Sequence, residues 1–294
     1  MDQTLIHLRE LRNHLTDEIF KALGMSTEGW WRKLLGPLFY TPTPRFSELA
    51  ANFDQYVARF GFHEAARWIL PHFVDDIEVH HVENIPQDGP LLVAANHPGS
   101  VDCLAIAASL PRNDIKIIAS AIPFLFKLPY TAQHLISTTL NAHERMNVIR
   151  SAIRHLQEGG ALLIFPSGNI DPDPAILPGA EDALHRWSRS LEIILSKVPQ
   201  TRVLPTIVSR VLSPTCLRNP ITRLRKELRD RQRLAEFIQV IQQLVLGKRF
   251  ALIPKITFGN PFTTEELNNG DFPATILQSI IDQTKQLLSR HLSL

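Results

Sequence analysis

Short apolar runs alternate with amphipathic stretches over most of the chain. Five runs have the length and composition of strands, and they cover residues 91–95, 115–120, 161–165, 203–208 and 251–258. The stretches between them carry apolar residues at helical spacing, as in residues 147–158, which end at the helix stop Gly159-Gly160. This alternation predicts an α/β fold.

Both ends of the chain carry helical patterns without strands. Near the start, Leu5, Leu8, Leu11 and Leu15 recur at helical spacing, and a second pattern covers residues 46–68. Residues 273–294 predict a terminal helix with Ile276, Ile280 and Leu287 facing inward. We therefore expect an N-terminal helical unit over 1–75, a catalytic domain over 76–264, and a C-terminal helix within 265–294 packed on that domain.

The composition is that of a globular protein, since 44% of the 294 residues are hydrophobic and 20% are charged. Two cysteines, Cys103 and Cys216, are too few for a disulfide framework and have no CxxC spacing, which favours a reducing cytoplasm. The charged start of the chain does not resemble a secretory signal. Every apolar run is shorter than the roughly 20 residues of a membrane-spanning helix. Any membrane contact is therefore expected to be peripheral, at the inner face of the cytoplasmic membrane.

Two segments are candidates for that contact. Residues 218–233 hold seven basic residues against Glu227 and Asp230, within a predicted loop and basic amphipathic helix near 221–249. Residues 29–44 concentrate aromatic side chains, including Trp30 and Trp31, around two basic residues. Both suit an anionic membrane surface, although a solvated helix face and ordinary packing are the simpler interpretations. Nucleic acid is not expected as a partner, because no reading motif accompanies the basic run.

The segment with the clearest chemistry is 91–110, where an apolar strand leads through Asn96-His97-Pro98-Gly99-Ser100 into an apolar helix. Pro98 and Gly99 argue for a turn rather than a helix at this point. Ser100 is then a candidate N-cap, and Asp102 in the first helical turn is close enough to accept a hydrogen bond from His97. Such a pair suits general-base activation of an alcohol. The simpler alternative is a surface histidine beside a helix-start carboxylate.

This segment resembles the glycerol-phosphate and lysophospholipid acyltransferase family, whose signature is a His and an Asp separated by four residues. The lead-in at 82–97 is also similar, and three later blocks follow in the family's order. These are Phe165-Pro166-Ser167-Gly168, the strand with Pro205, and residues 141–145 at the place of a phosphate-binding arginine block. The resemblance covers about residues 76–262.

The resemblance implies a mixed, mostly parallel sheet flanked by helices, and O-acyl transfer from acyl-CoA or acyl-carrier protein to a hydroxyl of a glycerolipid or lysophospholipid-type acceptor. It makes His97 and Asp102 the catalytic pair, acting without an acyl-enzyme and without a cofactor. The implied substrate-binding residues are Asn96, Gly99, Ser100, Arg145, Phe165, Pro166, Ser167, Gly168 and Pro205. Arg145 would bind the acceptor phosphate, with Arg150 or Arg154 as alternatives.

Ser167 departs from the family, which usually has Glu at this position, and this favours an acceptor other than free glycerol 3-phosphate. One alternative function is a serine hydrolase or thioesterase that uses Ser167 with the catalytic pair, although the chain has no GxSxG elbow. Another is a lipid-binding homologue without catalysis. A metal site at His80, His81 and Glu83 is not expected, because adjacent residues on a strand point to opposite faces.

Overall fold

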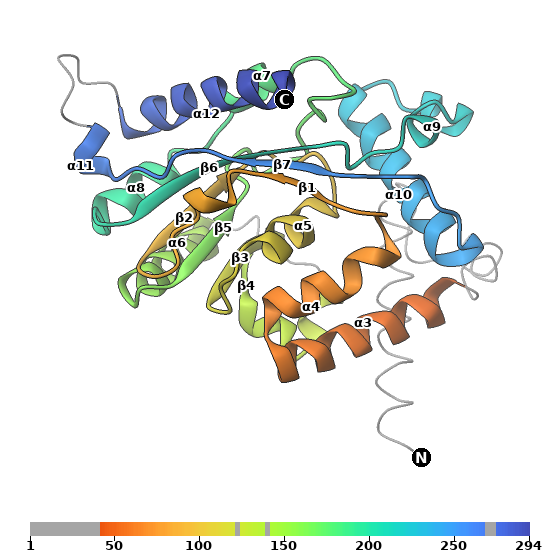
Figure 1. Ribbon diagram of the computed structural model, residues 1–294, viewed down its shortest axis with the longest axis horizontal. Helices are drawn as coiled ribbons and strands as arrows, with labels where there is room; N and C mark the ends of the chain where they lie inside the picture. The colour runs from red at the N-terminus through yellow and green to blue at the C-terminus, as the bar shows by residue number, and fades with distance from the viewer. Residues whose placement is uncertain (1–41, 121–123, 139–141, 268–274) are drawn as a thin grey trace.

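The computed structural model describes residues 42–120, 124–138, 142–267 and 275–294, and its centre is a seven-stranded sheet (Figure 1). The strands are β1 (Glu78–His80), β2 (Leu91–Ala95), β3 (Ile115–Ser120), β4 (Leu135–Thr138), β5 (Ala161–Ile164), β6 (Arg202–Ser209) and β7 (Lys255–Phe258). Their order across the sheet is β1-β7-β6-β2-β5-β3-β4.

Most neighbouring strands run parallel. Strand β2 pairs in parallel with β5 and β6, and β3 pairs in parallel with β5 and β4. The exception is β7, which is antiparallel to β6 and carries β1 as its parallel neighbour at the sheet edge. The predicted mixed, mostly parallel sheet is therefore confirmed. The edge strand β4 was not predicted, because Ile136 is its only buried residue and the four residues carry little apolar signal.

Both faces of the sheet are buried. In β2, Leu91, Val93 and Ala95 pack into one apolar core, whereas Leu92 and Ala94 pack into the other. Successive side chains of a strand point to opposite faces, so a strand covered on both sides is apolar at every position. This is why β2 and β5 appear in the sequence as unbroken apolar runs.

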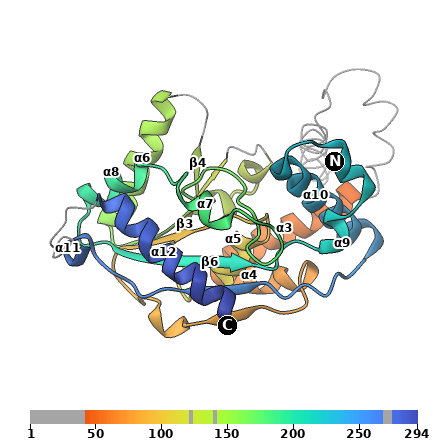
Figure 2. The ribbon, with the colours of Figure 1, turned by 90° about the horizontal axis from the view of Figure 1, so that it is seen from above.

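Helices cover the two faces as separate layers (Figures 1 and 2). The first layer contains α3 (Pro42–Phe60), α4 (Phe62–Ile69) and α5 (Asp102–Ser109). The second contains α6 (Ala142–Gln157), α8 (Ser190–Lys197) and α12 (Ile276–Ser293). Short helices connect these elements: α7 (Ala180–Leu184), α9 (Pro214–Leu217) and α11 (Thr264–Leu267). Ile280 and Leu287 of α12 are buried as expected, and Ile276 is partly buried.

The helical pattern over 46–68 forms two helices rather than one. They meet at Gly61, whose φ of 85° lies in the left-handed region. A side chain there would also collide with Asn113, since a Cβ atom would lie 2.3 Å from its Oδ1. Glycine therefore fixes the corner between α3 and α4. The candidate membrane segment with Trp30 and Trp31 lies outside the described residues.

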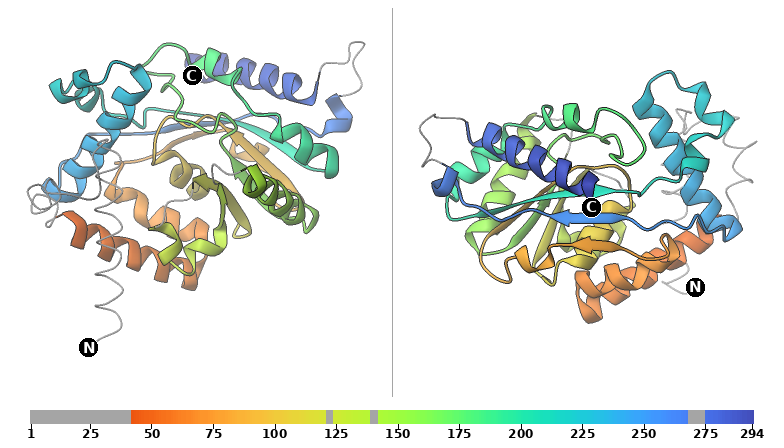
Figure 3. Two further views of the ribbon diagram at one scale, coloured as in Figure 1. Left: turned by 180° about the vertical axis from the view of Figure 1, so that it is seen from behind. Right: turned by 45° about the horizontal axis from the view of Figure 1, so that its top comes forward.

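The basic segment contains both predicted parts, a short non-helical start and a helix. A 3₁₀ turn η6 (Pro220–Leu224) comes first, and helix α10 (Leu228–Leu246) follows within the predicted range 221–249. Arg225 and Glu227 between them have extended backbones, which separates the two elements. Helix α10 packs against α3 and η6 at one end of the molecule, as Figures 1 and 3 show. Across the described ranges, no helix combines the length and apolar character needed to span a bilayer.

Candidate active site

The signature residues gather at the carboxyl edge of the parallel strands. His97 lies two residues beyond β2, and Phe165 directly follows the adjacent strand β5. Open α/β sheets bind ligands at this edge, because loops leave neighbouring strands there and expose backbone groups and side chains together. The strand pairing thus brings two motifs, separated by about 70 residues in sequence, to one place.

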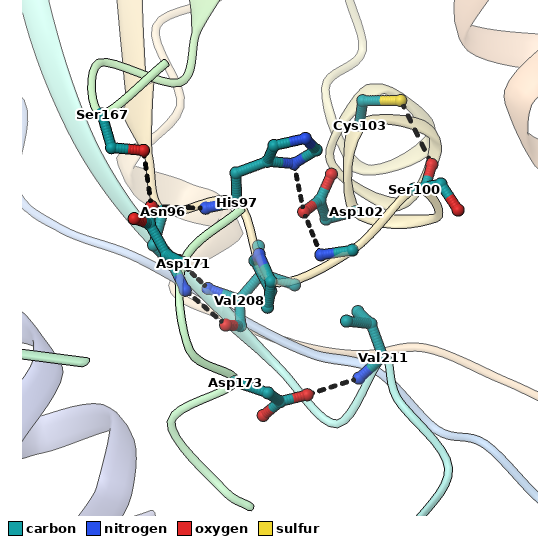
Figure 4. A network of polar contacts seen from close by, with 12 residues as sticks. Asn96, His97, Ser100, Asp102, Cys103, Ser167, Asp171, Asp173, Val208 and Val211 are labelled. Carbon is teal, nitrogen blue, oxygen red and sulfur yellow. Dashed lines mark hydrogen bonds and ion pairs between the residues drawn. The ribbon is translucent and has the colours of Figure 1, made fainter. Parts of the chain in front are cut away.

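The side chain of Asn96 anchors the turn that carries His97 to strand β6. This buried amide donates to the carbonyl of Val208 at 2.9 Å and accepts from the amide of Val208 at 2.7 Å (Figure 4). Strand β2 ends at Ala95, and the Asn96 side chain takes the place of the next backbone hydrogen bonds to β6. The described contacts of Asn96 therefore position the turn, and its predicted contact with substrate remains a prediction.

His97 and Asp102 form a direct pair, with 2.9 Å between Nδ1 of the imidazole and Oδ2 of the carboxylate (Figure 4). The same Oδ2 accepts from the amide of Gly99 at 3.0 Å, which closes the turn. Helix α5 begins at Asp102 with Val101 as its N-cap residue, so the prediction of Ser100 as N-cap was wrong. The carboxylate of Asp102 takes the role of closing the turn instead.

The side chains of His97 and Asp102 differ in their exposure to solvent. The side chain of Asp102 is completely buried, whereas 28% of the His97 side chain is exposed. The imidazole lies over the ring of Phe165, with centroids 4.4 Å apart and an angle of 27° between the planes. Because Nδ1 is bound to Asp102, Nε2 is the nitrogen available to a ligand.

The charge on His97 is controlled by surrounding carboxylates. Burial opposes protonation, but the charge and hydrogen bond of Asp102, together with the smaller effects of the Glu236 and Asp171 charges, outweigh it and raise the pKa of His97 from 6.5 to about 9. At neutral pH the imidazole of the free protein is therefore mostly protonated. Oδ1 of Asp102 is buried without a hydrogen-bond partner among the described residues. Such an incompletely satisfied charge is costly and is characteristic of functional sites.

The second motif forms a tight turn beside this pair. The amide of Gly168 donates to the carbonyl of Phe165 at 3.0 Å, and the φ of Gly168 is 62°, a conformation that favours glycine. The hydroxyl of Ser167 lies 2.9 Å from the carbonyl of Asn169 and 3.1 Å from Oδ2 of Asp171. Pro166 is buried and its carbonyl accepts from the amide of Ser188.

Asp171 links the two motifs and was missed by the sequence analysis. Its amide donates to the carbonyl of His97 at 2.8 Å, and its Oδ2 accepts from the amide of His97 at 3.1 Å. Burial raises the pKa of Asp171, against the effects of these hydrogen bonds and of Arg186 at 3.5 Å. No motif signals this residue, because its role depends on contacts between segments distant in sequence.

Helix α10 supplies further residues that the sequence analysis missed. Gln232 donates from Nε2 to the carbonyls of Pro98 and Asp171, at 2.7 and 2.8 Å. Oε1 of Glu236 accepts from the amide of Ser100. The available signal was their spacing: polar residues at 232, 236, 239 and 243 share one face of a helix, and in the structure all four are buried.

The remaining predicted residues are placed less directly. Pro205 is buried within β6 beside Ala94, and its carbonyl accepts from Gly259. Arg145 falls within α6, but its side chain is outside the described part. The side chains of Arg150 and Arg154 on the same helix are exposed. The proposed roles of these residues in binding substrates remain predictions.

The histidines considered for a metal each pair with a carboxylate. His80 contacts Glu78 at 2.7 Å, and His81 contacts Glu83 at 3.2 Å. No group of three or more His, Cys, Asp or Glu side chains arranged for a metal ion occurs within the described ranges.

The chain was also compared with known protein families, curated sequences and solved structures. Residues 76–209 match the family model described as Acyltransferase. No curated protein sequence matches. Among solved structures, the chain is similar to the 1-acyl-sn-glycerophosphate (LPA) acyltransferase PlsC from Thermotoga maritima, with 18% identity, a TM-score of 0.43, and coverage of 96% of this chain and 98% of the other.

Proposed function

We propose that the chain transfers a fatty acyl group from acyl-CoA or acyl-carrier protein to a hydroxyl of a lysophospholipid or similar glycerolipid, with His97 as general base. The observation that carries this proposal is the His97–Asp102 pair within the residues that match the Acyltransferase family model. Asp102 fixes the tautomer in which Nδ1 carries a proton, and the partly exposed imidazole edge faces the ligand.

The reaction then proceeds as a direct displacement. Nε2 of neutral His97 accepts the proton of the acceptor hydroxyl as its oxygen attacks the thioester carbonyl carbon. The tetrahedral intermediate collapses, the carbon–sulfur bond breaks, and the leaving thiolate takes the proton from the imidazolium. The products are an ester and a free thiol, and the enzyme returns to its starting state. Asp102 stabilises the imidazolium during both proton transfers.

The neighbouring side chains support a mechanism without an enzyme nucleophile. The described hydrogen bonds of the Ser167 hydroxyl join it to Asp171 and Asn169, whereas a serine hydrolase needs its serine bonded to the catalytic histidine. Burial and the charge of Asp102 raise the pKa of the Cys103 thiol to about 12, which keeps it protonated at neutral pH. Neither side chain is prepared to form an acyl-enzyme.

The acceptor preference rests on Ser167. A neutral hydroxyl replaces the family's carboxylate at this position and leaves the turn less acidic. Two guanidinium groups lie at the same loop, since Arg186 is 3.5 Å from Asp171 and Arg229 donates to Asn169 at 3.2 Å. A phosphodiester in the headgroup of a lysophospholipid suits such cations.

The enzyme is also proposed to work at an anionic membrane surface. Ile221, Leu224 and Leu228 are exposed at 53%, 79% and 39%, where most apolar side chains of this size are buried. Exposed basic residues lie among them: Arg218, Arg223, Lys226, Arg229 and Arg233. Apolar side chains entering the lipid interface beside cations at the headgroups are typical of peripheral docking. We call this region, residues 218–233, the η6–α10 surface.

A single assay tests the transfer reaction. Purified full-length protein is incubated with labelled acyl-CoA or acyl-carrier protein and with glycerol 3-phosphate, lysophospholipids or no acceptor, and the products are separated. The proposal expects labelled phospholipid that depends on a lysophospholipid acceptor. Labelled free fatty acid without acceptor dependence would support the hydrolase, and bound label without turnover would support the lipid-binding alternative.

Vesicle sedimentation tests the membrane contact. Binding to anionic vesicles should weaken with salt and with Leu224→Gln, whereas Ile193→Gln is the matched control, because Ile193 is 44% exposed on α8 and outside the η6–α10 surface. Equal binding to neutral and anionic vesicles would remove the role of the basic residues.

A further inference from the structure

A buried carboxylate of α10 faces the catalytic turn. Glu236 is 9% exposed, and its Oε1 accepts from the amide of Ser100. The approach to the turn is close, since a Cβ atom at position 99 would lie 2.7 Å from Oε1 of Glu236 and 3.1 Å from Cγ2 of Val211. A larger residue at this position would displace the carboxylate, which comes from a segment 136 residues away from Ser100.

The same face of α10 makes further contacts with backbone groups. Gln232 bonds to the carbonyls of Pro98 and Asp171, and Gln239 bonds to the amide of Ser213 and the carbonyl of Val211. One turn further on, Gln243 donates to the carbonyl of Phe73. The bonds of Gln232 and Gln239, on either side of Glu236, fix the rotation and height of this part of the helix, so the position of Glu236 is determined by more than its own contact.

The charges around His97 come from three elements. Asp102 lies on α5, Asp171 follows β5 and has Arg186 as its partner, and Glu236 lies on α10. The neighbouring thiol of Cys103 is neutral. Burial is the largest influence on Glu236 and raises its pKa, Asp102 acts in the same direction, and the Ser100 amide and His97 oppose them. Glu236 and His97 thus affect each other's protonation.

We propose that Glu236 is a positioning residue for the acyl transfer, with its carboxylate holding the Ser100 amide and contributing negative charge to the imidazolium form of His97. The inference rests on the proposed role of His97 as base. Catalysis benefits because positive charge develops on His97 as the acceptor hydroxyl loses its proton, and a fixed negative charge stabilises that state. The side chain acts through His97 and does not contact the reacting atoms.

Two substitutions separate the charge from the hydrogen bond. Glu236→Gln keeps an oxygen acceptor for the Ser100 amide but removes the charge, whereas Glu236→Ala removes both. Gln243→Ala is the matched control, because it also removes a buried hydrogen bond of α10 but lies away from His97. The pKa of His97 is measured by NMR titration of histidine-labelled full-length protein, with His97→Gln to assign the resonance.

The proposal expects a lower pKa of His97 in Glu236→Gln and no change in Gln243→Ala. The rise of kcat/KM with pH should move to lower pH in Glu236→Gln by the same amount, and its plateau should fall. Glu236→Ala should lose up to about 10²-fold in kcat/KM, because the turn is also displaced. If Glu236→Ala does not fold, Glu236→Gln still decides the question.

An unchanged pKa of His97 in a folded Glu236→Gln variant would overturn the inference and leave Glu236 a purely structural residue. This outcome differs from failure of the proposed function. If the wild-type protein shows no acyl transfer, His97 still titrates, and its pKa still reports whether Glu236 acts on it.

Discussion

Two histidines of this protein have similar hydrogen-bonding capacity but opposite surroundings. His97 lies at the carboxyl edge of the sheet with a carboxylate on Nδ1 and an exposed edge. His291, near the end of α12, is 1% exposed, with the hydroxyls of Ser209 and Thr257 each 2.7 Å from a ring nitrogen. Lys255, also buried, donates to the carbonyl of His291 at 2.7 Å.

These surroundings move the two histidines in opposite directions. Burial lowers the pKa of His291 to about 3, and the nearby charges of Lys255 and Arg210 add to this effect. At His97, carboxylates overcome the effect of burial and raise the pKa to about 9. An oriented, partly exposed imidazole beside carboxylates suits proton transfer. A buried, neutral imidazole bonded to hydroxyl groups suits a structural role in packing.

The largest expected effect is on activity, and it should distinguish substitution of His97 from substitution of His291. His97→Ala should lower kcat by roughly 10²- to 10⁴-fold with little loss of stability, because it removes the base from a partly exposed position. His291→Ala should keep kcat in the folded fraction but lower the melting temperature, since it opens a buried space and leaves polar partners unpaired. Steady-state kinetics and thermal unfolding of both variants provide the comparison. Equal activity in the two variants would contradict it.

The next largest effect is expected for Asp102, the carboxylate that His97 has as a partner and His291 lacks. Asp102→Asn should lower kcat/KM by about 10²-fold or more, because the imidazole loses its orientation and its negative partner. Its pH profile is more diagnostic. In the wild type, kcat/KM should rise with pH towards the pKa of His97 near 9, since only the neutral imidazole accepts a proton. In Asp102→Asn that pKa falls, so the smaller activity should reach its plateau at lower pH.

The turn that carries His97 was predictable from sequence because it is local. An unbroken apolar run, a Pro-Gly turn and an acidic residue five positions after the histidine are all visible in residues 91–102. The contacts of Asp171 and Glu236 with this turn were not predictable, because they join residues 74 and 136 positions apart. Ser100 was wrongly predicted as the N-cap, because the helix begins at Asp102 with Val101 as its N-cap residue.

The sheet shows the same division between local and long-range information. Its central strands were predicted because burial on both faces makes every residue apolar. The loop before the basic helix was predicted, but the residue at which the helix begins was not, because the basic residues of this segment fit a helix face equally well. Helix α10 is placed by its contacts with α3 and with the turn that carries His97.

A smaller effect should appear in stability below neutral pH. The unfolded chain binds a proton at His291 below its ordinary pKa of 6.5, whereas the folded protein does so only near pH 3. The free energy of unfolding should therefore fall on acidification between these values, by at most about 1.4 kcal/mol per pH unit from this residue. Denaturant titrations from pH 7 to pH 4 measure the slope. In His291→Gln the slope should be smaller, although the variant starts less stable, and an unchanged slope would refute the assignment.

The smallest expected effect is at Ser167. Ser167→Ala removes the hydroxyl near Asp171 and Asn169 but leaves the His97–Asp102 pair intact, so we expect a loss in kcat of about 10-fold or less. A serine hydrolase would instead lose nearly all turnover, because the hydroxyl would be its nucleophile. Mass spectrometry of wild-type protein quenched during turnover provides the independent measurement. Our mechanism expects no acyl adduct on Ser167, because the acceptor hydroxyl attacks the thioester directly. An adduct that forms and decays at the rate of turnover would assign the chemistry to Ser167 and make His97 the base of a two-step reaction.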